Sequence, residues 1–313
     1  MIVAIESLLP SLLLIGLGSG LVRTAIMSRE GWEGVERLNY YLLYPVLLFV
    51  SVVRADLRSA PVFSAGAAMA LGVATVAALM IVSRRLWPRL GAADGPAFTS
   101  HLQGAIRYNT AVALAVSGAL FGAEGLALAA LGAVAIVPLI NVLCVSALAT
   151  WASATPPRAA GLAKEIALNP LIIGTVAGAL VNASGLALYK PLVETFDLVG
   201  RGALGLALLL VGAGLRLQAL APRVDVAAST ALKLVLMPVA MTSYAIALGV
   251  EGAALAVVAI TGATPTASSA YVLARRMGGD AELMATLITT QTILAFATLP
   301  VAVWLAGGAG APP

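Results

Sequence analysis

Residues 252–276 read GAALAVVAITGATPTASSAYVLARR, and this stretch decides the fold. Two apolar halves flank the segment from Thr261 to Thr266. Proline inside a helix removes a hydrogen bond and clashes with the preceding turn, so the helix must break here. Threonine suits the N-cap and proline suits the first helical position, so we expect Thr264 to cap a new half-helix that begins at Pro265. Gly262 helps the chain to unwind before this point.

The composition places this broken helix in a membrane. Of the 313 residues, 61% are hydrophobic and only 10% are charged, whereas a soluble domain has about 25% charged residues. A transmembrane helix needs roughly 20 apolar residues, so the whole chain 1–313 is expected to form a single all-α polytopic membrane domain. Ten apolar segments can be marked, at residues 5–25, 37–53, 61–83, 97–121, 125–150, 166–184, 196–215, 226–249, 252–276 and 282–306.

Several functions are disfavoured by what the sequence lacks. The net charge of +4 mostly reflects loop residues that orient the helices, so nucleic acid is not an expected partner. Cys144 lies in an apolar run and no cysteine or histidine cluster accompanies it, so we expect no metal site. No Walker A sequence is present, and we expect no cofactor. No Asp or Glu lies deep in an expected span, so the sequence gives no direct sign of a sodium or proton site.

Basic residues are distributed unevenly among the expected loops. The loops after odd-numbered segments hold twelve of them, and the loops after even-numbered segments hold four. The positive-inside rule therefore makes the odd loops cytoplasmic. We expect a multi-pass protein of the cell (inner) membrane, in contact with the lipid bilayer, with both termini outside.

The chain also repeats itself at a nearly constant spacing. The matches predict two five-helix repeats, residues 1–154 and 155–313, and an odd number of helices turns the second repeat upside down. Inverted repeats are typical of secondary transporters, whose binding sites lie at the repeat interface near the middle of the membrane. The matched features are the helix openings Leu9-Pro10 and Asn169-Pro170, Gly18 with Gly178, Leu48 with Leu208, and Gly122-x-Glu124 with Gly278-x-Asp280.

A second break is expected in the segment 97–121, which contains Arg107-x-Asn109-Thr110. A charge at the bilayer centre costs about 2.5–3.5 kcal/mol, so Arg107 must face protein or a water-filled cavity. A shift of 156 residues places Pro265 opposite Asn109, so the two breaks occupy matching positions. The free N–H groups of half-helix N-termini carry roughly half a positive charge and suit a carboxylate. The alternatives are a plain proline kink and a structural polar helix in which Arg107 binds a carbonyl.

Other polar residues within the spans are weaker candidates. Lys233 can face the site, bind exposed carbonyls at a crossover, or extend to the membrane surface. Asn141 and Gln291 can bind substrate or only a neighbouring helix. The lone His101 is expected to be structural, and Gly174-x-x-x-Gly178 is expected to mediate close helix packing. The predicted substrate-binding residues are Asn109, Thr110, Arg107, Gly262, Thr264, Pro265, Thr266, Asn141, Lys233 and Gln291.

Three stretches resemble the auxin efflux carrier family. The run 262–280, GATPTASSAYVLARRMGGD, resembles the C-terminal signature of this family and is the most specific part. Asn169-Pro170-Leu-Ile-Ile is similar to its middle region, and Arg107-x-Asn109-Thr110 resembles its fourth-helix crossover motif. The resemblance covers nearly the whole chain.

The resemblance implies ten helices in a 5+5 inverted repeat with helices four and nine crossing, as in sodium/proton antiporters and bile-acid symporters. It also implies an elevator motion against a scaffold that often forms homodimers. By position, Asn109 and the segment Thr264–Thr266 would contact an anionic substrate. Tyr108 stands where plant carriers tend to place a proline, and the long loop of many plant members is absent. These departures favour a bacterial-type carrier of organic acids over a carrier of auxin itself.

Together these features predict a secondary transporter for small organic anions such as carboxylates, with export as the expected direction. An ion channel or a sensor built on the same fold is the alternative. An enzyme is not expected, because catalysis would need buried acid, base or metal residues. Only Arg107, Lys233 and His101 are available for such a role.

Overall fold

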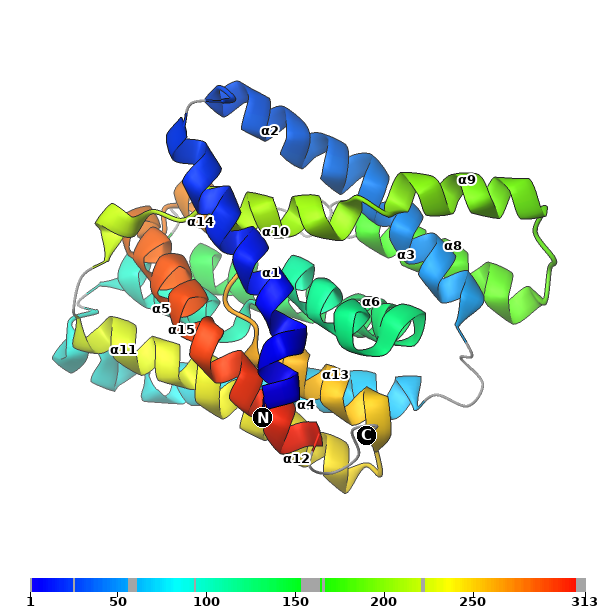
Figure 1. Ribbon diagram of the computed structural model, residues 1–313. Coiled ribbons are helices and arrows are strands. Elements are labelled where there is room, and N and C mark those ends of the chain that lie inside the picture. Colours follow the sequence, from blue (N-terminus) through cyan, green and yellow to red (C-terminus); the bar gives the residue numbers. More distant parts are fainter. Residues whose placement is uncertain are drawn as a thin grey trace.

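The computed structural model describes residues 2–24, 26–55, 61–92, 94–152, 164, 167–220 and 223–307, and over these residues the chain is all-helical, without β-strands (Figure 1). The predicted repeat boundary between residues 154 and 155 lies outside the described residues. The α-helices are α1 (Ile2–Leu21), α2 (Arg29–Leu38), α3 (Tyr44–Arg54), α4 (Val62–Val82), α5 (Gly95–Ile106), α6 (Thr110–Trp151), α8 (Pro170–Ser184), α9 (Lys190–Gly200), α10 (Ala203–Ala213), α11 (Val224–Ala231), α12 (Met237–Ala247), α13 (Gly252–Ala263), α14 (Ser269–Met277) and α15 (Ala281–Gly307). Short 3₁₀ segments are Val22–Thr24, Ser83–Leu90 and Leu217–Ala219, and π-turns are Asn39–Leu43 and Leu232–Leu236.

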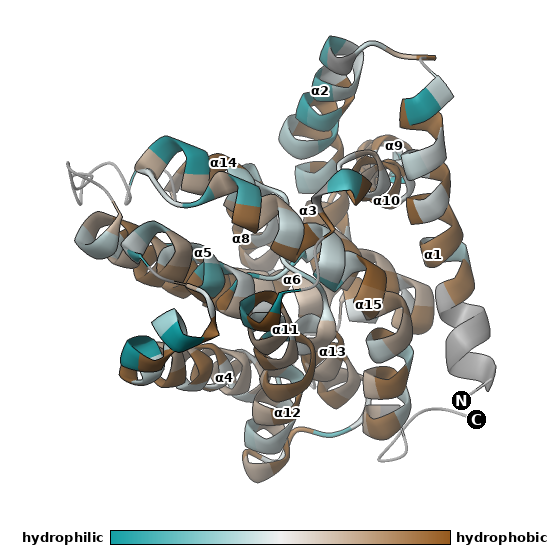
Figure 2. Ribbon diagram, turned by 90° about the vertical axis from the view of Figure 1, so that its left-hand side faces the viewer, coloured by the Kyte–Doolittle hydropathy of each residue, from teal (hydrophilic) through white to brown (hydrophobic). Residues whose placement is uncertain are grey.

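The described helices are apolar enough for a multi-pass membrane protein. By length and composition, five helical stretches of the described residues can cross a membrane: Val62–Leu90, Gly95–Trp151, Lys190–Ala213, Val224–Ala247 and Ala281–Ala306. Shorter apolar helices cover Leu9–Thr24, Pro170–Ser184 and Gly252–Ala263. Hydrophilic residues gather on α2, on α14 and at the start of α11, whereas apolar residues prevail on α13 and α15 (Figure 2).

Helix α6 is interrupted at one glycine. Its 42 residues would extend about twice the roughly 30 Å thickness of the hydrocarbon core if they formed one straight helix. Gly122 has φ 58° and ψ −139°, a backbone conformation that favours glycine, and it divides α6 into two helical parts. The division falls between the predicted segments 97–121 and 125–150.

The two predicted helix openings have different outcomes. Asn169 caps α8, because its Oδ1 accepts hydrogen bonds from the N–H groups of Leu171 and Ile172, and Pro170 occupies the first turn. This opening is confirmed. The opening at Leu9-Pro10 is wrong, since Pro10 lies inside α1. Leucine has no side-chain oxygen to cap a helix, so Leu9 cannot do what Asn169 does.

The helices pack in two groups. In one group, the scaffold group, α1 packs along α10, and α3 packs along α8 and α9. In the other, the core group, α13 packs on α12, α6 and α15, while α4 packs on α12 and α6. The half-helix α5 lies between α6, α15 and α11 in the core group. The two groups meet mainly where α6 contacts α3, α8, α10 and α1. Figure 1 shows α3, α8 and α9 together at one side of the molecule.

Glycines set the distance between helices of the scaffold group. A Cβ atom on Gly212 of α10 would collide with the carbonyl of Ile15 in α1, and one on Gly18 would collide with the carbonyl of Leu209. Gly174 and Gly178 of α8 lie in the same way against the backbone of α3. The predicted close packing at Gly174-x-x-x-Gly178 is therefore confirmed, and the close approach is possible only without side chains.

We expect Gly212→Ala to destabilise the protein by about 1–3 kcal/mol, because the added methyl group forces α1 and α10 apart. Thermal unfolding of the purified protein in detergent measures this loss. Gly205→Ala is the matched control in the same helix, since a Cβ there would meet no atom within 4 Å. That control should keep or raise the stability, by up to about 1 kcal/mol. Equal stability of the two variants would contradict the packing described for α10.

Candidate functional site

The two broken helices meet at their breaks. The first break separates α5, which ends at Ile106, from α6, which begins at Thr110. The second separates α13, which ends at Ala263, from α14, which begins at Ser269. The backbone N–H of Asn109 donates a hydrogen bond of 2.7 Å to the carbonyl of Pro265. These two residues, which were predicted to hold matching positions of the two repeats, are therefore in direct contact, and we call the region around the contact the crossover.

Asn109 closes the N-terminus of α6 with its own side chain. Its Oδ1 accepts hydrogen bonds from the N–H groups of Ala111 (3.1 Å) and Val112 (3.3 Å). The side chain is nearly buried, at 5% exposure. The oxygen of the amide is therefore used as a helix cap. Its nitrogen Nδ2 makes no hydrogen bond within the described part of the chain, so it can still donate to a ligand.

The segment from Thr264 to Thr266 is extended, and the prediction that Thr264 is an N-cap is wrong. Thr264 ends α13, and its hydroxyl donates to the carbonyl of Thr261 at 2.9 Å. Helix α14 begins only at Ser269, with Ser268 as its N-cap residue and without a side-chain cap. The backbone stays extended because its polar groups bond to other helices instead of to a helical turn: Pro265 to Asn109, and the N–H of Thr266 to Oε1 of Gln291 at 3.1 Å.

The C-terminal carbonyls of α5 have neutral partners from distant helices. The carbonyl of Gly104 accepts from the hydroxyl of Thr266 and from Nε2 of Gln291, both at 2.9 Å. The same hydroxyl lies 3.4 Å from the carbonyl of Arg107. Gln291 of α15 therefore bridges the two breaks with its donor and acceptor atoms. Its polar atoms hold the crossover together.

The C-terminus of α13 has a charged partner. Nζ of Lys233, which lies on the π-turn between α11 and α12, donates to the carbonyl of Gly262 at 3.0 Å. Of the three predicted possibilities, Lys233 therefore binds an exposed carbonyl at the crossover. Gly262 needs its lack of a side chain, since a Cβ atom would lie 2.7 Å from Cα of Pro238.

Arg107 turns toward the second half of α6. Its Nη2 donates to Oδ1 of Asn141 at 2.9 Å, and its Nε has no partner among the described residues. The guanidinium is half-buried, and Thr110, the first residue of α6, is half-buried beside the same break. Nine of the ten predicted residues therefore form hydrogen bonds at the crossover or with Arg107. The tenth, Thr110, lies next to them.

Two polar features were missed by sequence reasoning. Gln103, one turn before Arg107 on α5, is fully buried, and neither of its amide atoms has a partner in the described part of the chain. The second feature is an ionic cluster around Asp225, which is 1% exposed at the start of α11. The spacing Arg223-x-Asp225 before a helix was a signal that could have found it.

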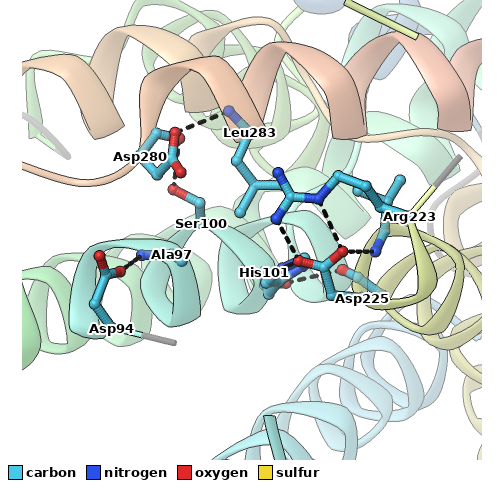
Figure 3. A network of polar contacts seen from close by, with 10 residues as sticks. Asp94, Ala97, Ser100, His101, Arg223, Asp225, Asp280 and Leu283 are labelled. Carbon is cyan, nitrogen blue, oxygen red and sulfur yellow. Dashed lines mark hydrogen bonds and ion pairs between the residues drawn. The ribbon is translucent and has the colours of Figure 1, made fainter. Parts of the chain in front are cut away.

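The ionic cluster and its neighbours join the middle of α5 to the starts of α11 and α15 (Figure 3). The carboxylate of Asp225 accepts two hydrogen bonds from Arg223, at 3.0 and 2.6 Å, and lies 3.1 Å from Nε2 of His101 on α5. Ser100, next to His101, donates to the carbonyl of Asp280, whose carboxylate caps α15 through the N–H of Leu283. His101 is therefore structural, as expected. Among the described residues no group of three or more His, Cys, Asp or Glu side chains could hold a metal ion.

Comparison with known proteins gives one family match. Residues 155–305 match the family model described as membrane transport protein. This is the family of the auxin efflux carriers, so over these residues the match confirms the resemblance and indicates a membrane transporter. A search of curated proteins finds no match to the chain.

We expect Asp225→Ala to destabilise the protein by about 3–5 kcal/mol, because it leaves His101 and Arg223 without their shared partner. Chemical or thermal unfolding in detergent measures the effect. Asp197→Ala is the control, since Asp197 pairs with Arg54 and Arg201 at an exposed position where an ion pair contributes up to about 1 kcal/mol. If both substitutions cost the same, the cluster does not stabilise the helix ends.

Proposed function

We propose that this transporter is a secondary carrier of small organic anions, carboxylates above all, that exports them across the cell membrane by an elevator motion. The observation that carries the proposal is the direct contact of the two helix breaks, Asn109 N–H to Pro265 carbonyl. Irregular backbone at membrane depth is tolerated only where it is buried in protein or lines a cavity. Paired broken helices with matching breaks are typical of the binding sites of secondary transporters.

The charge distribution at the crossover favours an anion. The negative ends of α5 and α13 already have partners: Thr266 and Gln291 at the first, and Lys233 at the second. The positive end of α14 has no side-chain cap, and Ser268 and Ser269 are exposed there. Arg107 adds a half-buried guanidinium at the other break. The unpartnered Nε of Arg107 and the N-terminus of α14 are donors, which suit a carboxylate.

An inverted repeat of ten membrane-spanning helices is part of the proposal, and the scaffold contacts support it. Gly18 of α1 packs on Leu209 of α10, and Gly178 of α8 packs on Phe49 of α3. Gly178 follows Gly18 by 160 residues, and Leu209 follows Phe49 by 160 residues. The second contact is therefore equivalent to the first with the two halves of the chain exchanged. This is what two equivalent helix pairs related by a pseudo-two-fold axis would show. In this arrangement both termini face outside.

The elevator motion is proposed from the division into two groups. The core group contains both half-helix pairs, and the scaffold group contacts it through α6 and through the end of α10. At that end, Arg216 donates to the hydroxyl of Tyr271 in α14 at 3.3 Å and stacks on its ring at 4.4 Å. These exposed contacts can break and form again while the crossover moves as one rigid unit.

Counterflow in proteoliposomes tests the substrate class, with a panel of labelled mono- and dicarboxylates and indole-3-acetate. We expect saturable exchange of at least one acid, because a carrier moves its binding site back across the membrane while a solute molecule is bound to it. Exchange needs no driving ion. If folded, inserted protein exchanges none of these acids, the carboxylate proposal is wrong, and a current far above carrier turnover would favour a channel.

Substitution of Asn109 separates its two expected roles. Asn109→Ser keeps an oxygen that caps α6 but removes the amide donor, whereas Asn109→Ala removes both. We expect Asn109→Ala to lose about 1 kcal/mol of stability, and Asn109→Ser to lose little. Both should weaken substrate binding roughly tenfold, as expected for a lost hydrogen bond to a charged group. Unchanged affinity in Asn109→Ser, measured by counterflow, would remove Asn109 from the binding site.

A disulfide between the two groups tests the elevator motion. A Cβ atom on Gly214 would lie 3.6 Å from Oγ of Ser268, which is compatible with a disulfide. We expect the pair Gly214→Cys and Ser268→Cys, in a background in which the buried Cys144 is replaced by alanine, to stop exchange when oxidised and to recover when reduced. Each single cysteine variant is the control and should keep exchanging. Full exchange by the cross-linked protein would exclude relative motion of the groups at this point.

A further inference from the structure

Lys233 is a basic residue in the interior of the molecule, and it has no acidic partner among the described residues. Its side chain is 0% exposed. None of the ion pairs in the described part of the chain involves Lys233. Its hydrogen bond goes to the carbonyl of Gly262, in the last turn of α13. An isolated buried ammonium is very costly unless something compensates its charge.

The end of α13 supplies that compensation. A helix C-terminus carries roughly half a negative charge on its free carbonyls. The last turn of α13 contains no basic residue of its own. Lys233 reaches this end from the neighbouring helix, on a π-turn that also brings Pro238 against Gly262. The C-terminus of α5 differs, because its Gly104 carbonyl is met by the neutral donors of Thr266 and Gln291.

In transporters with broken helices, half-helix C-termini and unwound carbonyls are the groups that coordinate coupling cations. Here the side-chain nitrogen of Lys233 occupies such a place. We propose that Lys233 is a built-in cation, which takes the position of an alkali cation at the end of α13 and keeps the crossover assembled without one. The inference rests on the proposed carrier function only for its transport consequence, which is exchange that does not require sodium. Lys233 thereby acts as a positioning residue, since it holds Gly262 and the segment that follows it.

The test compares thermal unfolding of three purified full-length proteins in sodium chloride, in choline chloride and in ethylammonium chloride at equal ionic strength. These are the wild type, Lys233→Ala and Lys233→Met. Alanine leaves a cavity beside an unpartnered carbonyl, which a small cation can fill. Methionine fills much of the same volume without a charge, so it is the matched control for packing.

We expect the wild type to unfold at the same temperature in all three salts. Both variants should unfold at lower temperature in choline. Sodium or ethylammonium should raise the unfolding temperature of Lys233→Ala by about 3 °C or more relative to choline, and should not raise that of Lys233→Met. A merely structural lysine would give no such difference between the two variants.

Two results would overturn the proposal. One is a wild type that sodium stabilises over choline, because a bound alkali cation would then be present as well. The other is an identical response of Lys233→Ala and Lys233→Met to all three cations. Since unfolding needs no substrate, this outcome is independent of the carboxylate assignment. Counterflow of the wild type in sodium-free choline buffer completes the test, and a requirement for sodium there would contradict a built-in cation even if a carboxylate is the substrate.

Discussion

The structure depends on the hydrogen bond between the Asn109 N–H and the Pro265 carbonyl, where two interrupted helices meet. Backbone polar groups inside a membrane must find partners within the protein, and a broken helix exposes several of them at once. Each break donates to the other: the N–H of Asn109 to the carbonyl of Pro265, and the hydroxyl of Thr266 to the carbonyl of Gly104 at the end of α5. Thr266 and Gln291 from the second half of the chain close the end of α5, and Lys233 closes the end of α13. Neither helix break is therefore stable without the other, and their contact joins the two halves of the chain into one unit.

This pairing also decides the electrostatics of the site. The negative helix ends are neutralised by groups that belong to the protein, whereas the donors around Arg107, Asn109 and the start of α14 stay available. The proposed anion binding would use these available donors and needs no exposed lysine. In the proposal for Lys233, its side chain takes the place of an additional cation at the end of α13.

The two groups of helices are held together in physically different ways. The scaffold helices pack through glycines at very short distance, which leaves no freedom for sliding between α1 and α10 or between α3 and α8. The core group is held by polar contacts at the crossover and by the Asp225 cluster, which lies between the middle of α5 and the starts of α11 and α15. Contacts between the groups include exposed ones such as Arg216 with Tyr271. Rigid parts joined by weak contacts are what relative motion of two domains requires.

The sequence by itself determined the membrane class, the two breaks and their pairing, because apolar runs and an interior proline act locally. It also identified Asn109, Gln291, Lys233 and the glycines of α8, since polar or small residues inside apolar spans are costly unless they bind something. Only the tertiary structure decided what each one binds. Thr264 ends a helix instead of starting one, Pro10 lies within a helix, and Asp225 is buried. The reason is that decisive partners are distant, as with Lys233 and Gly262, 29 positions apart, and Gln291 and Gly104, 187 positions apart, and no local pattern records which distant helix satisfies a given polar group.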